Sequence, residues 1–172
     1  MPINRYFIAI IPPEPIAGEI YKLKEYFRDQ YNSKASLNSP THITLHMPFE
    51  FEKEDKLVQA LKRFDFKSSN IELNNFGCFE PRVIFVDVKK NNTLDDTQKK
   101  LTTFCKTELN LFNAQYRDQP FHPHVTVAFR DLKKPMFEQA WNEFKDRKYN
   151  ATFECHGLSL MKHDGKFWRE FS

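Results

Sequence analysis

The sequence passes twice through the same order of predicted elements: a strand, an amphipathic helix, a strand with a histidine and a threonine, a second helix and another strand. The first pass begins at the apolar run 5–11, and the second begins at the run 82–88. Identity between the passes is slight, so the order of elements is what repeats. Two lobes of like construction can bring corresponding strands to one groove, related by a pseudo-two-fold axis.

The helices are predicted from apolar residues at spacings of three and four. We expect the strand 70–76 to end at Gly77, and Asn92 or Thr93 to cap the helix that follows the run 82–88. The residues 151–161 read as one strand, which pairs with a last strand, 166–171, across an Asp-Gly turn. The polar stretch 32–39 is expected to be a loop near the groove. The helical faces are Ile16, Ile20, Leu23, Phe27 and Tyr31; Leu57, Ala60, Leu61 and Phe64; Leu94, Leu101, Phe104 and Leu109; and Met136, Ala140, Trp141 and Phe144.

Length and composition indicate one globular domain. The chain has 172 residues, of which 40% are hydrophobic and 15% aromatic, and this excludes a disordered protein. We therefore expect residues 1–172 to form a single two-lobed domain. The net charge of +3 is far from the strongly basic surface of a dedicated duplex-binding protein, and it fits a small anionic ligand better.

Cysteine usage and the N-terminal segment bear on location. The three cysteines, Cys78, Cys105 and Cys155, are an odd set without C-x-x-C spacing, so the sequence predicts no disulfide framework and no four-ligand zinc site. The apolar run 7–11 is too short for a signal sequence or a membrane span and is followed by two prolines. We expect a cytoplasmic monomer that does not enter a membrane.

The two histidine-threonine stretches are the main functional signal. Residues 41–47 read THITLHM, and residues 121–127 read FHPHVTV. One such spacing among six histidines is unremarkable, but two at matching places in a repeated pattern are not readily ascribed to accident. Alternate residues of a strand point to one face. The side chains that then share a face are His42, Thr44 and His46 in the first stretch, and His122, His124 and Thr126 in the second.

Paired imidazoles and hydroxyls suit chemistry at a phosphodiester. One imidazole must accept a proton from the attacking hydroxyl or water, and another must deliver a proton to the departing oxygen. Histidine can exist in either state near neutral pH, because its ordinary pKa is about 6.5. A threonine hydroxyl can donate to a phosphate oxygen without adding charge, and its stiff side chain limits the ordering cost.

The same residues resemble a known family. THITL and HPHVTVAF are similar to the paired motifs of the two-histidine phosphoesterase superfamily, which includes the 2′-5′ RNA ligase-like proteins and the cyclic phosphodiesterases. The resemblance extends over nearly the whole chain, through RYFIAIIPP, GCFEPRVIFVDV and the closing strand pair. It implies an α+β, bilobal fold in which two antiparallel sheets face a central groove, with helices on the outside.

The resemblance also implies residue roles and an activity. His42 and His124 would be the catalytic acid/base pair, and Thr44 and Thr126 would bind the phosphate. The enzyme would be a metal-independent phosphoric diester hydrolase acting on a cyclic phosphodiester or a 2′-5′ linkage of a nucleotide or RNA end. The alternative is a non-catalytic nucleotide or RNA-end binding protein of the same fold. Hydrolysis and ligation, and the choice of base and acid between the histidines, stay open.

The chain departs from the family pattern in two places. After the first motif it has His46-Met47-Pro48-Phe49, where many members have Phe-Leu-Gly. Many ligase-like members have an arginine five residues after the second motif histidine; here that position is Phe129, and Arg130 follows, expected on the other strand face. Phe79, His122 and Arg130 are candidates for substrate contact, Phe79 by stacking on a base.

A metal site is the remaining alternative for the histidines. It would use His46, His122 and His124, but the sequence places no carboxylate near them at ligand spacing, and the threonines would stay unexplained. We expect neither a metal nor another cofactor. His156 and His163 are expected to be structural or surface residues.

Overall fold

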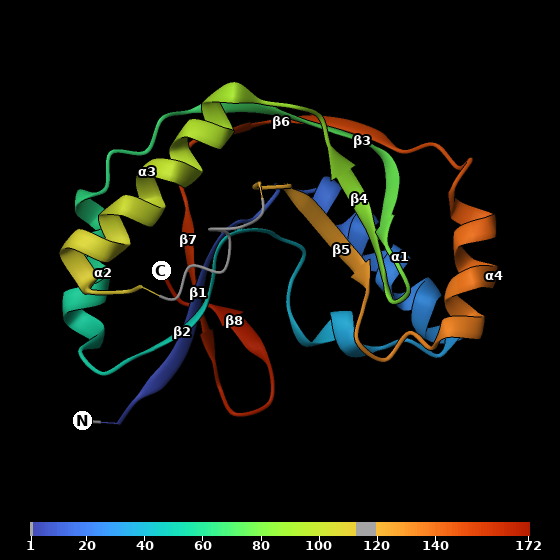
Figure 1. Cartoon of the computed structure of the whole chain (residues 1–172), viewed down its shortest axis with the longest axis horizontal. Helices are drawn as coiled ribbons and strands as arrows, with labels where there is room; N and C mark the ends of the chain where they lie inside the picture. The colour runs from blue at the N-terminus through green and yellow to red at the C-terminus, as the bar shows by residue number, and fades with distance from the viewer. Residues whose placement is uncertain (1, 113–119) are drawn as a thin grey trace.

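The computed structural model describes residues 2–112 and 120–172, and its elements follow the predicted order (Figure 1). The first pass contains β1 (Asn4–Ile10), α1 (Ile16–Tyr31), β2 (Ile43–Phe51), α2 (Glu54–Arg63) and β3 (Ser69–Phe79). The second contains β4 (Val83–Val88), α3 (Asn92–Leu109), β5 (His124–Ala128), α4 (Lys134–Phe144) and β6 (Asn150–Cys155). A 3-10 helix, η1 (Ala35–Asn38), precedes β2, and the strands β7 (Ser159–His163) and β8 (Trp168–Glu170) follow β6.

The strands form two antiparallel four-stranded sheets, with the orders β2-β1-β7-β8 and β5-β4-β3-β6. The predicted α+β class with two antiparallel sheets is therefore confirmed. β3 belongs to the first pass in sequence, yet it pairs with β4 and β6 of the second. The first pass thus contributes strands to both sheets.

The helices cover the sheets from outside, and one helix of each pass lies on the sheet of the other pass. α3 contacts β2 and α2, whereas α1 contacts β5 and α4. In Figure 1, α2 and α3 accordingly lie at one end of the molecule and α4 at the other. α1 covers the second sheet because its apolar stripe, with Ile20 and Phe27 at 0% exposure, packs into the core there. One core cluster therefore includes residues of both sheets.

Three expectations about local structure are wrong. The run 151–161 is two strands, because the chain leaves one sheet after Cys155 and enters the other at Ser159. Gly77 lies inside β3, where it pairs with Phe85. The cap of α3 is Asn91, whose side chain accepts a hydrogen bond from the Leu94 amide at 3.0 Å. The predicted β7–β8 hairpin is confirmed.

No helix in the two described ranges is long and apolar enough to cross a membrane.

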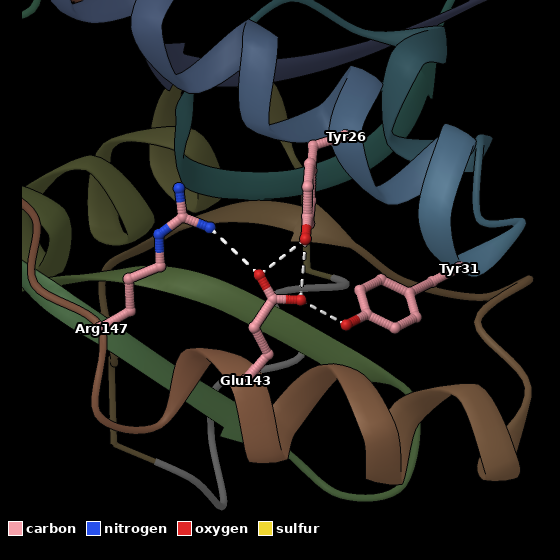
Figure 2. A network of polar contacts seen from close by, with 4 residues as sticks. All are labelled: Tyr26, Tyr31, Glu143 and Arg147. Carbon is pink, nitrogen blue, oxygen red and sulfur yellow. Dashed lines mark hydrogen bonds and ion pairs between the residues drawn. The ribbon is translucent and has the colours of Figure 1, made fainter.

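Glu143 joins α1 to α4 through an exposed polar network (Figure 2). The Tyr26 hydroxyl donates to its Oε2 at 2.7 Å, the Tyr31 hydroxyl donates to its Oε1, and the Arg147 guanidinium pairs with it at 3.4 Å. Hydrogen bonding to Glu143 raises the pKa of Tyr26. Burial, and then the bond to the same carboxylate, raises the pKa of Tyr31. The network therefore favours protonated tyrosines in the folded state.

Replacing Glu143 by glutamine tests this contact. Because the folded-state pKa values are raised, the stabilisation is complete below the ordinary tyrosine pKa of about 10 and is lost as the pH rises through the folded-state values. We expect Tyr26 and Tyr31 to ionise at lower pH in Glu143→Gln, followed by tyrosinate absorbance, and stability to fall less steeply with alkaline pH. Glu138→Gln, an exposed position on the same helix, is the control. Unchanged tyrosine ionisation in Glu143→Gln would contradict the prediction.

Candidate active site

The first motif lies at the start of β2. His42 and Thr44 are partly exposed, whereas the alternating residues Ile43 and Leu45 are fully buried. The Nδ1 atom of His42 lies 2.7 Å from the carbonyl oxygen of Pro40. Because a carbonyl oxygen only accepts, Nδ1 carries the hydrogen in this contact, and Nε2 is the acceptor nitrogen of the neutral ring.

The second motif repeats this geometry at β5. His124 and Thr126 are partly exposed, and Val125 and Val127 are fully buried between and after them. The Nδ1 atom of His124 lies 2.7 Å from the carbonyl oxygen of His122, again two residues upstream. Each motif histidine is therefore held by the same backbone contact, with Nε2 directed away from it.

The two motifs meet between the sheets. β2 contacts β5, although the two strands belong to different sheets. Electrostatic repulsion from His124 contributes to lowering the pKa of His42. Two imidazoles that are remote in the sequence are thus neighbours in the fold.

His46 does not share the face of His42 and Thr44, so that prediction is wrong. Ala9 pairs with Thr44, but its neighbour Ile8 pairs with His46, which makes Leu45 an extra residue in the ladder. Such a bulge changes the direction of the side chains beyond it. His46 is 1% exposed and packs at 5.2 Å against the ring of Phe49.

The electrostatic surroundings of the two motif histidines differ. Burial, and then the charge of Lys24 on α1, lower the pKa of His42 to about 4, against the opposing effect of the Pro40 carbonyl. Burial also lowers the pKa of His124, and the charge of His122 adds to this, but the His122 carbonyl and the carboxylate of Asp87 act in the opposite direction. His42 is thus the histidine more firmly held neutral, and His124 has the environment that better accommodates a proton.

A cavity of about 340 Å³ opens on the first motif. Its charged side chains, Arg5, Arg130 and Lys166, are all cationic, with no carboxylate in the described lining. His124 and Thr126 do not border it. The cavity is therefore a one-sided, positively charged extension of the site. Its lining is Arg5, Phe7, Ala35, Asn38, Ser39, His42, Thr44, Met47, Pro48, Phe129, Arg130, His163, Lys166 and Trp168.

Arg130 lines this cavity together with Phe129, so the expectation that it points to the opposite side is wrong. β5 ends at Ala128, and Arg130 has a left-handed φ of 63°. A left-handed residue breaks the alternation of a strand. The strand rule that separates neighbouring residues onto two faces therefore does not apply to this pair.

Phe79 and His122 lie beside His124. The ring of Phe79, 39% exposed, meets the His124 ring edge-on at 5.1 Å, and the Phe85 ring lies 4.9 Å from it. His122 Nε2 lies 3.1 Å from Asp87 Oδ1. Asp87 is opposite His124 in the β4–β5 ladder. A carboxylate is thus close to these histidines in space, although the sequence did not indicate one.

A metal centre does not emerge from this arrangement. Within residues 2–112 and 120–172, no three histidine, cysteine, aspartate or glutamate side chains are placed to hold an ion together. His46, which the metal alternative requires, is buried in the core.

Comparison with known proteins places this site in a family. The family model described as the 2′-5′ RNA ligase superfamily matches residues 12–167. The chain belongs to this superfamily. It is 28% identical over 167 residues to an RNA 2′,3′-cyclic phosphodiesterase of Methanocaldococcus jannaschii, covering 92% of this chain and 90% of that protein. It is 26% identical over 166 residues to the enzyme of the same name in Bacillus subtilis, covering 91% and 82%.

Solved structures support the fold of the superfamily. The structure of E. coli LigT in the apo form matches with a TM-score of 0.68 and 18% identity, covering 99% of this chain and 95% of that one. The predicted family and fold are confirmed. The roles of the individual site residues remain predictions.

Several residues at the site were not singled out for it by the sequence analysis. Arg5, His163 and Lys166 line the cavity, and His163 had been expected to be structural or on the surface. Lys24 had a detectable signal, because it lies four residues after Ile20 and three before Phe27, inside the apolar stripe of α1. The Trp168 ring meets the rings of Phe7 and His163 edge-on at the cavity, with centroid distances of 4.7 and 4.9 Å.

Gly77 leaves room for the Phe85 ring beside His124. A Cβ atom at this position would lie 2.5 Å from the Cε1 atom of Phe85. We expect Gly77→Ala to lower the free energy of unfolding by about 1–3 kcal/mol, as overpacking does, and to shift the His124 ring signals in nuclear magnetic resonance spectra. Gly157→Ala is the control, since its Cβ would meet nothing within 4 Å. Equal stability and equal His124 signals in both variants would contradict the prediction.

Proposed function

We propose that the protein is a metal-independent phosphoesterase that opens a cyclic phosphodiester or a 2′-5′ linkage at a nucleotide or RNA end. The observation that carries the proposal is the duplicated contact of each motif histidine with the carbonyl two residues upstream. It leaves two Nε2 atoms for proton transfer, on neighbouring strands of different sheets. The two relatives named RNA 2′,3′-cyclic phosphodiesterases, and the structure of E. coli LigT complexed with 3′-AMP, support this substrate class.

The differing surroundings of the histidines suggest their order of action. Neutral His42 accepts a proton from the attacking water at Nε2 while the water oxygen bonds to phosphorus. The bond from phosphorus to the departing ribose oxygen breaks, and protonated His124, next to Asp87, gives its Nε2 proton to that oxygen. One proton thus moves from water to His42, and one moves from His124 to the departing oxygen, without a metal.

The other residues of the site stabilise the charge that develops on the phosphate. Thr44 and Thr126 donate their hydroxyl hydrogens to the non-bridging oxygens, and Arg130 places a cation close to the first motif. Phe79 offers an exposed ring beside His124 for a base. His122 remains paired with Asp87 and supports the second motif.

Single substitutions of the motif histidines test the mechanism. We expect His42→Ala and His124→Ala each to lower kcat by about 10²–10⁴-fold on RNA with a 2′,3′-cyclic phosphate end, because each removes one proton transfer. His156→Ala, an exposed histidine between β6 and β7, should keep wild-type turnover. Turnover should be unchanged by a chelator. Wild-type turnover in either motif variant would refute the mechanism, and binding without turnover by the unmodified protein would favour a non-catalytic binding protein.

The pH dependence of kcat/KM provides a separate test. The base must be neutral, so activity rises through the low pKa of His42, at about 4. The acid must be protonated, so activity falls through the pKa of His124, which lies below its ordinary value of about 6.5. We expect a bell-shaped profile with its maximum on the acidic side of neutrality, measured on the same cyclic substrate. A profile that rises steadily through neutral pH would contradict it.

A further inference from the structure

Lys24 is a lysine buried in the apolar face of α1, with 1% of its surface exposed. Its Nζ atom donates to the carbonyl oxygens of Ser36 and Ser39, each at 3.0 Å. Both acceptors belong to the segment 33–39, which leads directly into the first motif. The side chain therefore holds the backbone that presents His42.

Packing alone does not account for a lysine here. Burial lowers its pKa to about 7, so the folded environment disfavours the charged form. A buried charge is usually no more stabilising than an apolar side chain of similar volume. The contacts of Lys24 with two carbonyls before the motif point to a role in the site.

The segment 33–39 also contacts the second motif. The Ser36 hydroxyl donates to the carbonyl oxygen of Val127, the residue after Thr126, at 2.8 Å. Asp131 accepts hydrogen bonds from the Ser33 hydroxyl at 2.8 Å and from the amides of Lys34 and Ala35 at 3.1 Å. One short segment is thus fixed to α1 by Lys24 and to the strand of the second motif by Ser36.

We propose that Lys24 is a positioning residue for His42: it holds the carbonyls of Ser36 and Ser39, so that the imidazole faces the second motif, and it places a positive charge behind the ring. The inference rests on the proposed function, in which His42 begins as the neutral base. Lys24 acts on His42 through two contacts. Its ammonium binds the Ser39 carbonyl, and the next residue, Pro40, provides the carbonyl that holds His42 Nδ1.

The charge of Lys24 then acts on His42 in a defined direction. A nearby positive charge disfavours the imidazolium form, so Lys24 helps to keep the base neutral. Tyr21, on the same helix, has its ring 5.9 Å from the Lys24 ammonium. Among the residues that the structure describes, the other charged or titratable groups around His42 are His124 of β5 and, in the lining of the cavity that His42 borders, Arg5, Arg130, His163 and Lys166.

Replacing Lys24 by methionine removes the charge and both hydrogen bonds but keeps an unbranched side chain. We expect the pKa of His42, measured by nuclear magnetic resonance titration without substrate and assigned with His42→Asn, to rise in Lys24→Met. The acidic limb of the kcat/KM profile should move in the same direction. Because the imidazole is also less well placed, kcat should fall about 10- to 100-fold, with a smaller change in KM.

The matched control is Lys22→Met, at an exposed lysine two residues away on the same helix. It should leave the His42 titration, the pH profile and turnover as in the wild type. Lys24→Gln, which keeps a neutral N–H donor group but no charge, is the second variant if Lys24→Met does not fold. A purely structural role would lower activity at every pH without moving the acidic limb.

A measurement on the unchanged protein requires no variant. Lys24 must be protonated over the pH range in which His42 titrates, and this is followed from the signals of its side-chain methylene next to Nζ. A neutral Lys24 in that range would overturn the proposal, as would wild-type His42 titration and turnover within about twofold in a folded Lys24→Met or Lys24→Gln.

Failure of the positioning role of Lys24 can be distinguished from failure of the proposed function. If His42→Ala is inactive while Lys24→Met behaves as the wild type, only the positioning role fails. If His42→Ala keeps full turnover, the proposed function itself fails.

Discussion

The site depends on a backbone contact made twice: a histidine Nδ1 held by the carbonyl oxygen two residues before it. This contact fixes the tautomer and the rotation of the ring, and so determines where Nε2 points. It requires a chain that approaches each motif in a set conformation. Much of the surrounding structure serves that requirement, from the η1 segment before His42 to the β4–β5 ladder beside His124.

The pseudo-two-fold arrangement makes the two motifs alike in geometry but not in charge. A buried lysine lies near the first and an aspartate lies beside the second. The asymmetry therefore comes from residues outside the motifs, on α1 and β4. In the proposed reaction, one imidazole accepts a proton and the other donates one, and this difference in charge would assign the two otherwise similar imidazoles to those separate roles.

The sequence predicted the parts of the site that follow from strand alternation. His42, Thr44, His124 and Thr126 lie on partly exposed faces, with buried residues between them. It failed at His46, because a bulge is a feature of pairing between strands and does not show in the spacing within one strand. It failed at Arg130 for a related reason, since the left-handed conformation after β5 ends the alternation.

The sheet to which each strand belongs also could not be predicted from local sequence patterns. Gly157 in the run 151–161 indicates an interruption, but a local pattern does not show that the strands on its two sides belong to different sheets. Asp87 lies beside the second motif only because β4 pairs with β5. Lys24 could have been noticed, because a charged residue inside an apolar helical stripe needs a partner, but the identity of that partner depends on how the chain folds back.

The placement of α1 limits how this molecule can move. α1 is connected to β1 and β2 by the chain, yet it packs on β5 and α4 of the other sheet. A hinge that swings the N-terminal half away from the C-terminal half would have to pull this helix out of the core. Ligand entry and exit should therefore involve side chains and loops at the rim, while the walls that carry the imidazoles stay in a constant spatial relation throughout turnover.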